Sequence, residues 1–207
     1  MKKTAVALVV AALGLIAGEA MAQQQSPWLV RVRAVNIDPA NKSDANAGAG
    51  LPANDITVSS KVIPEVDISY FVTPNIAAEL ILTYPQKHDV SVGALGGKIG
   101  TFKHLPPTLT LQYHFTPEAK FSPYVGAGVN YTNISSVDLG NGAITLDRNS
   151  FGLALQAGVD FKLDKNWSIN LDVKKVQIRS DVYLNGGKIS NVQVDPLLVG
   201  VGVGYRF

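Results

Sequence analysis

The stretch Leu197-Leu-Val-Gly-Val-Gly-Val-Gly-Tyr-Arg-Phe207, which ends the printed sequence, decides the fold. Every second residue from Leu197 to Phe207 is large and apolar or aromatic, and glycine fills most of the positions between them. Successive side chains of a β-strand point to opposite faces, so this period of two predicts a strand with one bulky apolar face. The glycine-rich face suits the narrow interior of a small barrel.

Seven further segments alternate in the same way, which brings the predicted total to eight strands. They are residues 28–35, 65–71, 79–84, 108–115, 124–131, 151–161 and 167–174. Short turns are predicted near residues 73–75, 116–118 and 164–166, and longer polar or glycine-rich links at roughly 38–55, 88–106, 136–149 and 181–190. Alternating short and long connections between strands predict an all-β, eight-stranded antiparallel up-and-down barrel.

Two barrels fit this pattern: a soluble one with an apolar interior and a membrane one with an apolar exterior. Small residues gather on the polar face, whereas leucine, valine and phenylalanine fill the other face, whose ends carry aromatic rings such as Trp28, Trp167 and Tyr205. Aromatic rings concentrate at the two interfaces of a bilayer. The pattern therefore favours a transmembrane β-barrel in contact with outer-membrane lipids, with short periplasmic turns and long extracellular loops.

The first 22 residues have the pattern of a cleaved signal peptide, with Lys2-Lys3, an apolar stretch from Ala5 to Ala17 and the small-x-small site Ala20-Met-Ala22. Cleavage there leaves residues 23–207 as one barrel domain in the outer membrane of a Gram-negative-type cell envelope. The ending Gly202-x-x-Tyr205-x-Phe207 is typical of outer-membrane barrels, and predicts recognition by the barrel assembly machinery.

The inward face predicts a polar plug below an apolar pocket. Its charged residues, expected to pair inside the barrel and to leave no continuous water channel, are Arg31, Arg33, Glu65, Asp67, Glu79, Asp160, Asp172, Lys174 and Arg206. Towards the long loops the inward residues become apolar and predict a pocket for a small hydrophobic ligand, formed by Val35, Ile37, Ile81, Val176, Ile178 and Leu198. Simple packing of these six side chains beneath the loops is the alternative.

Composition and motifs argue against several other functions. With 18 Lys and Arg against 16 Asp and Glu, no basic stretch could follow a nucleic acid backbone, and the absence of cysteine excludes thiolate metal sites. We assign no catalytic residue, metal or cofactor. His88 and His104 lie in or beside the second long link, where solvated loop histidines are the simpler interpretation; a metal or pH-sensitive site is the alternative.

Several segments closely resemble the OmpW family of small outer-membrane proteins. They include Val32-Arg-Ala-Val-Asn-Ile-Asp-Pro39, Thr73-Pro-Asn-Ile-Ala-Ala-Glu-Leu80, Lys103-His-Leu-Pro-Pro-Thr108 and Pro123-Tyr-Val-Gly-Ala-Gly-Val-Asn-Tyr131. The resemblance implies an eight-stranded barrel that passes small hydrophobic molecules from outside into its upper part and then sideways into the membrane. A structural or receptor-like barrel that transports nothing is the alternative.

One departure from the family pattern is Lys174-Lys175, where aromatic residues are common in strand seven. Lys174 is expected to pair with an inward carboxylate. Lys175 is expected near a membrane interface, because an exposed lysine at mid-membrane costs about 2–4 kcal/mol.

Overall fold

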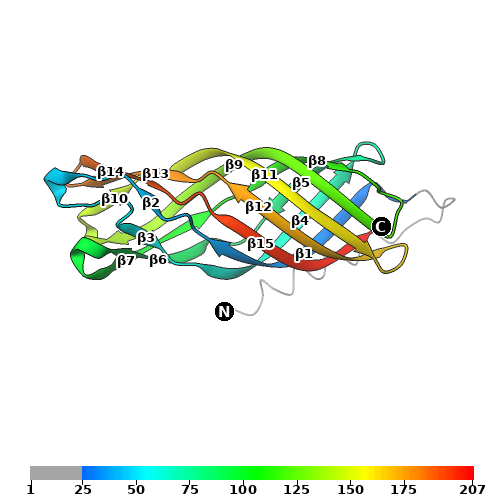
Figure 1. Cartoon of the computed structure of the whole chain (residues 1–207), viewed down its shortest axis with the longest axis horizontal. Helices are drawn as coiled ribbons and strands as arrows, with labels where there is room; N and C mark the ends of the chain where they lie inside the picture. The colour runs from blue at the N-terminus through cyan, green and yellow to red at the C-terminus, as the bar shows by residue number, and fades with distance from the viewer. Residues whose placement is uncertain (1–24) are drawn as a thin grey trace.

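The computed structural model describes residues 25–207. The predicted signal peptide and its cleavage site after Ala22 lie outside the described residues. Within them, eight strands close into an antiparallel ring in the order β1-β4-β5-β8-β9-β11-β12-β15 and back to β1 (Figure 1), which confirms the predicted barrel. The strands are β1 (Trp28–Asp38), β4 (Lys61–Phe71), β5 (Ile76–Leu82), β8 (Thr108–His114), β9 (Phe121–Leu139), β11 (Asn149–Lys162), β12 (Trp167–Val176) and β15 (Leu197–Arg206).

The first and last strands close the ring, with Val30 opposite Tyr205 and Ile37 opposite Leu198. Their close contact depends on glycine, since a Cβ atom at Gly202 would collide with the carbonyl oxygen of Val32. The alternation of bulky and bare positions in the last strand therefore has a packing reason. The bulky side chains of β15 point out of the barrel, and its glycine-rich inner face leaves space for the interior side chains of the neighbouring strand.

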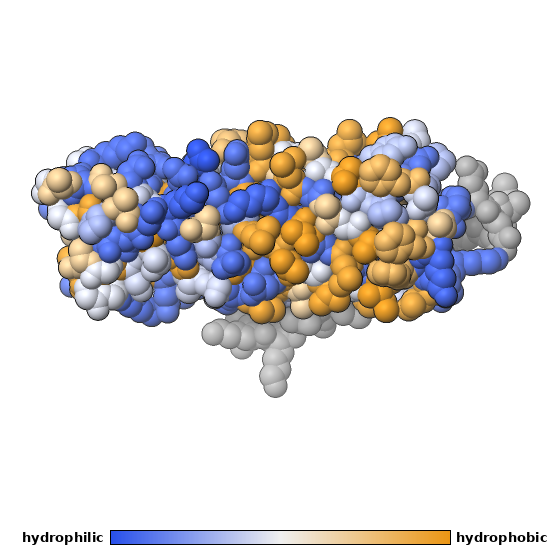
Figure 2. Space-filling model, in the orientation of Figure 1, coloured by the Kyte–Doolittle hydropathy of each residue, from blue (hydrophilic) through white to orange (hydrophobic). Residues whose placement is uncertain are grey.

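The exterior of the ring is an apolar belt. In Figure 2 the hydrophobic surface lies over the half of the molecule that holds the short turns, and polar surface covers most of the opposite half. Aromatic pairs border the belt, with ring centroids 4.8 Å apart for Trp28 and Tyr70 and 4.9 Å apart for Trp167 and Tyr205. The apolar face therefore points outward, as predicted. No helix in residues 25–207 is long and apolar enough to cross a membrane.

The long links were predicted to be loops, but they form a second set of paired β-strands. It contains β2 (Lys42–Ser43), β3 (Ile56–Val58), β6 (Gln86–Val92), β7 (Gly97–Leu105), β10 (Ile144–Leu146), β13 (Arg179–Leu184) and β14 (Gly187–Gln193). Three short 3₁₀ turns, η1 (Ala47–Ala49), η2 (Gly93–Leu95) and η3 (Gly140–Gly142), lie among them. Together with the outer half of β9, these strands continue the wall beyond the apolar belt, at the left of Figure 1. We call this tier the extension.

The sequence did not predict the extension because its strands have two to nine residues and their pairing contains register shifts, in β6–β7, β7–β9 and β13–β14, that interrupt the period of two. Its alternation also has the opposite polarity. Val90, Phe102 and Val182 are buried inside, whereas Lys87 and Lys103 are exposed outside. The core of the extension is therefore apolar, like that of a soluble barrel.

Candidate binding cavity and internal charge network

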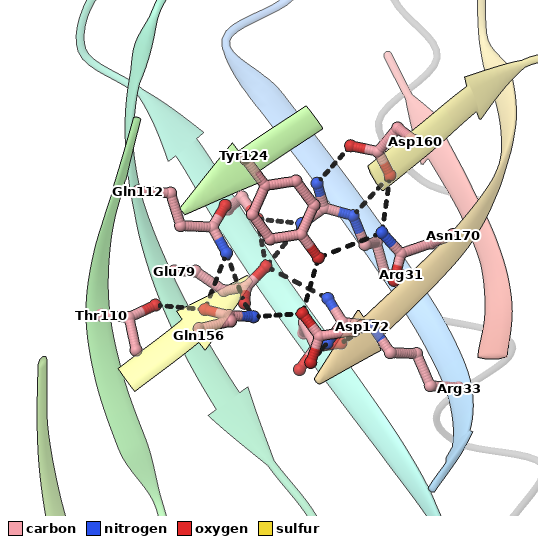
Figure 3. Close-up of polar contacts among 12 residues, drawn as sticks. Arg31, Arg33, Glu79, Thr110, Gln112, Tyr124, Gln156, Asp160, Asn170 and Asp172 are labelled. Atoms are coloured by element: carbon pink, nitrogen blue, oxygen red, sulfur yellow. Dashed lines mark hydrogen bonds and ion pairs between the residues drawn. The ribbon is translucent and has the colours of Figure 1, made fainter. Parts of the chain in front are cut away.

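A network of buried charges fills the barrel at the level of the apolar belt, and Figure 3 shows its centre. Arg31 reaches across the lumen from β1. Its guanidinium lies 2.5 Å from the Glu79 carboxylate and contacts Asp160 through two hydrogen bonds of 2.7 and 3.1 Å. This fork geometry satisfies a planar cation with two carboxylates from different strands.

A second group of charges lies directly above the first. Arg33 is 3.1 Å from both Asp67 and Asp172, and Lys174 is 2.5 Å from Glu65 and 3.1 Å from Asp172. The contact between Arg33 and Asp67 lacks hydrogen-bond alignment, so charge attraction holds it. Lys174 thus pairs with an inward carboxylate, as the sequence suggested.

Neutral side chains connect the charges. Gln156 donates to Glu79 at 3.0 Å and to Asp172 at 2.8 Å, while the Tyr124 hydroxyl donates to Asp172 at 2.7 Å. The Tyr124 ring also lies 5.1 Å from the guanidinium carbon of Arg31. Sequence reasoning did not include Tyr124 in the plug. The available signal was its position as a large residue on an inward face that is otherwise glycine-rich.

The ninth predicted plug residue, Arg206, lies elsewhere. Its guanidinium covers the ring of Phe71 at 3.9 Å and donates to the Ser26 carbonyl at 2.9 Å, near the short-turn end. The other eight predicted residues contact one another. Three cations therefore face five carboxylates in the plug, one cation fewer than the sequence suggested.

Above the plug, the extension encloses a cavity of about 560 Å³. We call it the upper cavity. Its wall is apolar apart from two polar side chains, His104 and Ser180, and is formed by every strand of the extension except β2. Among the wall residues are Leu51, Ile56, Val58, Val92, Phe102, Ile134, Leu139, Ile144, Val182 and Val192.

The six predicted pocket residues lie below most of this wall. Ile178 lines the upper cavity, and together with Ile37, Ile81, Val176 and Leu198 it also lines a smaller space of about 30 Å³, the lower cavity, directly above Lys174 and Glu65. The sixth residue, Val35, is buried in the same apolar core. These residues form the floor between plug and upper cavity. Sequence reasoning missed the walls above them, because it treated those segments as loops.

His88 and His104 are buried inside the extension, so their interpretation as solvated loop residues is wrong. They are 1% and 3% exposed, and their rings stack with centroids 4.8 Å apart. His88 Nδ1 lies 2.7 Å from the Ser59 carbonyl oxygen, and since a carbonyl only accepts, this nitrogen carries the proton. Burial lowers the pKa of His88, and burial and the nearby His88 and Lys61 lower the pKa of His104 to about 3.

The barrel wall has a weak seam beside the lower cavity. The ladder between β5 and β8 ends at Ile81 and Thr108, and the one between β6 and β7 begins at Gln86 and His104. Pro85 on one side and Pro106 and Pro107 on the other lack backbone donors, which weakens any pairing across the gap. Asn130 of β9 donates to both the Pro106 and Pro107 carbonyls at 3.2 Å, so it holds one edge of the seam to the neighbouring strand and does not cross the seam.

The remaining predicted residues lie at the ends of the ring. Lys175 is exposed at the end of β12 and donates to the Asp195 carbonyl. At the opposite end, the Tyr205 ring lies 5.0 Å from that of Phe207, whose backbone nitrogen donates to the Trp28 carbonyl at 3.2 Å. Gly202 is at the close contact of β15 with β1 described above.

Known proteins match almost the whole chain. The OmpW family model covers residues 24–207. The chain is 43% identical over 196 residues to an uncharacterized outer-membrane protein, y4mB, of Sinorhizobium fredii, covering 92% of this chain and 84% of that one. It is 32% identical to the outer membrane protein W of Escherichia coli, over the full length of both. The dibenzothiophene metabolism operon protein PahQ of Pseudomonas aeruginosa is 28% identical, over 89% of this chain and 90% of that protein.

Among solved structures, the outer membrane protein OprG of Pseudomonas aeruginosa superposes with a TM-score of 0.78 at 30% identity, covering 89% of this chain and 97% of that one. The match in fold, length and sequence extends through both the ring and the extension. The chain therefore belongs to the OmpW family and is an eight-stranded barrel of the bacterial outer membrane.

Proposed function

We propose that this protein admits small hydrophobic molecules into the outer membrane through the upper cavity. The observation that carries the proposal is an apolar space of about 560 Å³ lined by the paired strands of the extension, beyond the membrane belt. Pockets of this size bind drug-sized ligands. An apolar molecule that leaves water for this cavity gains about 25 cal/mol for each Å² of apolar surface that it buries.

The exit in this proposal is sideways. Below the cavity, the ion pairs of Arg31, Arg33 and Lys174 fill the lumen, and an apolar molecule could pass them only by separating buried charges. The lower cavity, in contrast, borders the seam at Thr83 and Pro106. A short opening of that seam would lead into the lipid, where an apolar molecule is stable.

A relative supports the same class of substrate. The name of PahQ places that protein in an operon for the metabolism of dibenzothiophene, a flat aromatic compound of low polarity. The wall residues of the upper cavity in this chain suit such a compound.

Uptake of a hydrophobic fluorescent dye by cells that make or lack the protein tests the proposal. Ile178 lines both cavities, so Ile178→Trp should reduce protein-dependent uptake by more than half, whereas Ile178→Val should leave it near the wild-type level. Equal uptake with and without the protein would contradict the proposal. It would favour the structural or receptor-like alternative.

We also propose that the protein acts without catalysis. In the described residues, His88 and His114 bond a backbone carbonyl and an amide oxygen, not a serine or threonine hydroxyl. A lipid-modifying hydrolase needs a histidine paired with such a nucleophile. Overexpression should leave the masses of outer-membrane lipids unchanged, and a new deacylated species would contradict this.

The route to the membrane is a proposal as well. Residues 1–22 would direct export, and the ending Gly202, Tyr205 and Phe207 would be read by the barrel assembly machinery. Replacement of Phe207 by a polar residue should reduce the amount of folded protein in the outer membrane. An unchanged amount of heat-modifiable protein on gels would contradict this role.

A further inference from the structure

The ring of His104 is an exception in the upper cavity. It is 97% buried, faces both the upper and the lower cavity, and its ring nitrogens make no hydrogen bond with any described residue. The other polar side chain of the wall, Ser180, has its hydroxyl directed to the carbonyl oxygens of Asp147 and Asp181. Within the described wall, His104 thus offers the free hydrogen-bonding group nearest the floor.

The stacked partner holds this ring in place. The donation from His88 Nδ1 to the Ser59 carbonyl fixes the orientation of His88, and the two rings lie nearly parallel at 12°. The ring centroid of Phe102, on the same strand, lies 6.0 Å from that of His104. Among the described residues, the fully buried ring nitrogen without a partner is Nε2 of His88, whereas the nitrogens of His104 border the open space of the cavity.

A ligand that seals the His104 nitrogens from water without a hydrogen bond gives them the energetic penalty of an unpaired buried polar group, and a ligand that makes such a bond avoids it. A hydrocarbon that fills the cavity excludes water from His104 and leaves its donor and acceptor unpaired. A hydroxyl group can accept from the ring N–H or donate to the ring lone pair, so it satisfies His104 in either tautomer.

The charges around His104 determine which polar group a ligand in the cavity can carry. Burial and nearby positive charge lower the pKa of His104 to about 3, so the ring is neutral at the pH of the cell surface. Arg33 and Lys174, below the floor, are already paired with carboxylates. The remaining nearby cation, Lys61, is partly exposed and donates to the Lys87 carbonyl at 3.3 Å, so solvent screens it. A carboxylate ligand would therefore lose its hydration in a low-dielectric space without a buried cation to compensate it.

We propose that the cavity prefers apolar molecules that carry one neutral hydroxyl group, phenols or alcohols, with the hydroxyl on His104 and the apolar body against the extension walls. This inference rests on the proposed function, because it names the substrate class of the same cavity. His104 acts as a specificity-determining residue at the boundary between the two cavities.

Naphthalene, 2-naphthol and 2-naphthoate share one carbon skeleton and test the preference. Each is titrated into the full-length protein in lipid nanodiscs at pH 7, with empty nanodiscs correcting for partition into lipid. The wild type should bind naphthol about fivefold more tightly than naphthalene, the worth of one net hydrogen bond. It should bind naphthoate more weakly than naphthol.

Two variants assign the preference to one side chain. His104→Leu should remove the difference between naphthol and naphthalene and keep naphthalene binding. His104→Gln, which retains a donor and an acceptor, should restore part of the difference. Thr145→Val, on the exposed outer face of β10 and outside both cavities, should keep the wild-type ratio. Heat-modifiable migration on gels checks that each variant is folded.

The outcomes separate the two proposals. If none of the three compounds binds above empty nanodiscs, the proposed function fails. If naphthalene and naphthol bind equally to the wild type, if His104→Leu keeps the ratio, or if naphthoate binds most tightly, the hydroxyl preference is overturned while hydrophobic uptake stands.

Discussion

The membrane-spanning ring and the extension form one continuous wall, which β9 runs through, yet their polarity is inverted. In the ring, leucine and valine face outward and Arg31, Glu79 and Asp160 are buried inside. In the extension, Val90 and Phe102 are inside, while lysine and aspartate face outward. The change occurs near the floor of the upper cavity.

The comparison shows that the surrounding solvent decides which face of an alternating strand is buried. Lipid accepts apolar side chains and excludes charges, so the ring must hide its polar face, where eight strands leave room only for paired side chains. Water reverses the preference for the extension. The binding cavity can form only in the second environment, because only there is the interior apolar.

The largest expected effect is on the interior of the ring. Arg31→Leu removes the cation that Glu79 and Asp160 share and leaves buried carboxylates without compensation, which costs about 3–5 kcal/mol of unfolding free energy. Urea unfolding in lipid vesicles measures it. The matched control is Arg179→Leu, whose half-exposed ion pair with Asp195 in the extension is worth less than about 1 kcal/mol. Equal losses of unfolding free energy in the two variants would contradict the proposed difference between the ring and the extension.

The outer faces of the ring and the extension should differ almost as strongly in how much unfolding free energy an introduced arginine costs. Leu171 is exposed on β12 between Trp167 and Lys175, in the middle of the belt, so Leu171→Arg should cost about 2–4 kcal/mol. Thr145→Arg, on the exposed face of the extension strand β10, should change the unfolding free energy by no more than about 0.5 kcal/mol. The same unfolding assay applies, and a tolerated arginine at 171 would place the membrane boundary elsewhere.

Substitutions where β1 and β15 close the ring should lower the unfolding free energy by a more moderate amount. In Gly202→Ala the new methyl group would meet the Val32 carbonyl oxygen and the Arg33 backbone, and such overpacking typically costs about 1–3 kcal/mol. Gly200→Ala is the control. Its methyl group would lie 3.2 Å from a methyl carbon of Val35, which a small side-chain movement relieves, so a loss under about 1 kcal/mol is expected. A larger loss at 200 than at 202 would contradict this account of the closure.

The last effect concerns pH and is expected in the extension. The pKa of His104 is about 3 when folded against 6.5 when exposed, so below pH 6.5 the unfolded segment binds a proton that the folded one does not. The contribution of His104 is complete above pH 6.5 and is lost as the pH falls towards 3. Amide hydrogen exchange of β6 and β7 should accelerate in that range, and less so in His104→Phe. Equal acceleration in the variant would assign the effect to another group.

Sequence patterning predicted the ring well because each of its strands carries a long, uninterrupted period of two. Of the nine charged residues that it assigned to the plug, eight contact one another, since charges on an inward face have few alternatives to pairing. Arg206 was the exception, because its position at a strand end lets it reach Phe71 and the Ser26 carbonyl instead. The extension was missed, and with it the burial of His88 and His104.

By itself, the sequence determined the number of membrane strands, their faces, and the need for an internal charge network, because these depend on local alternation and on the cost of unpaired charge in lipid. Only the tertiary structure decided where the cavity lies. Its walls come from short strands that pair across long sequence separations, such as β7 with β9 and β10 with β13, and the position of His104 above the floor follows from that pairing. Such contacts are non-local, so no window of the sequence contains them.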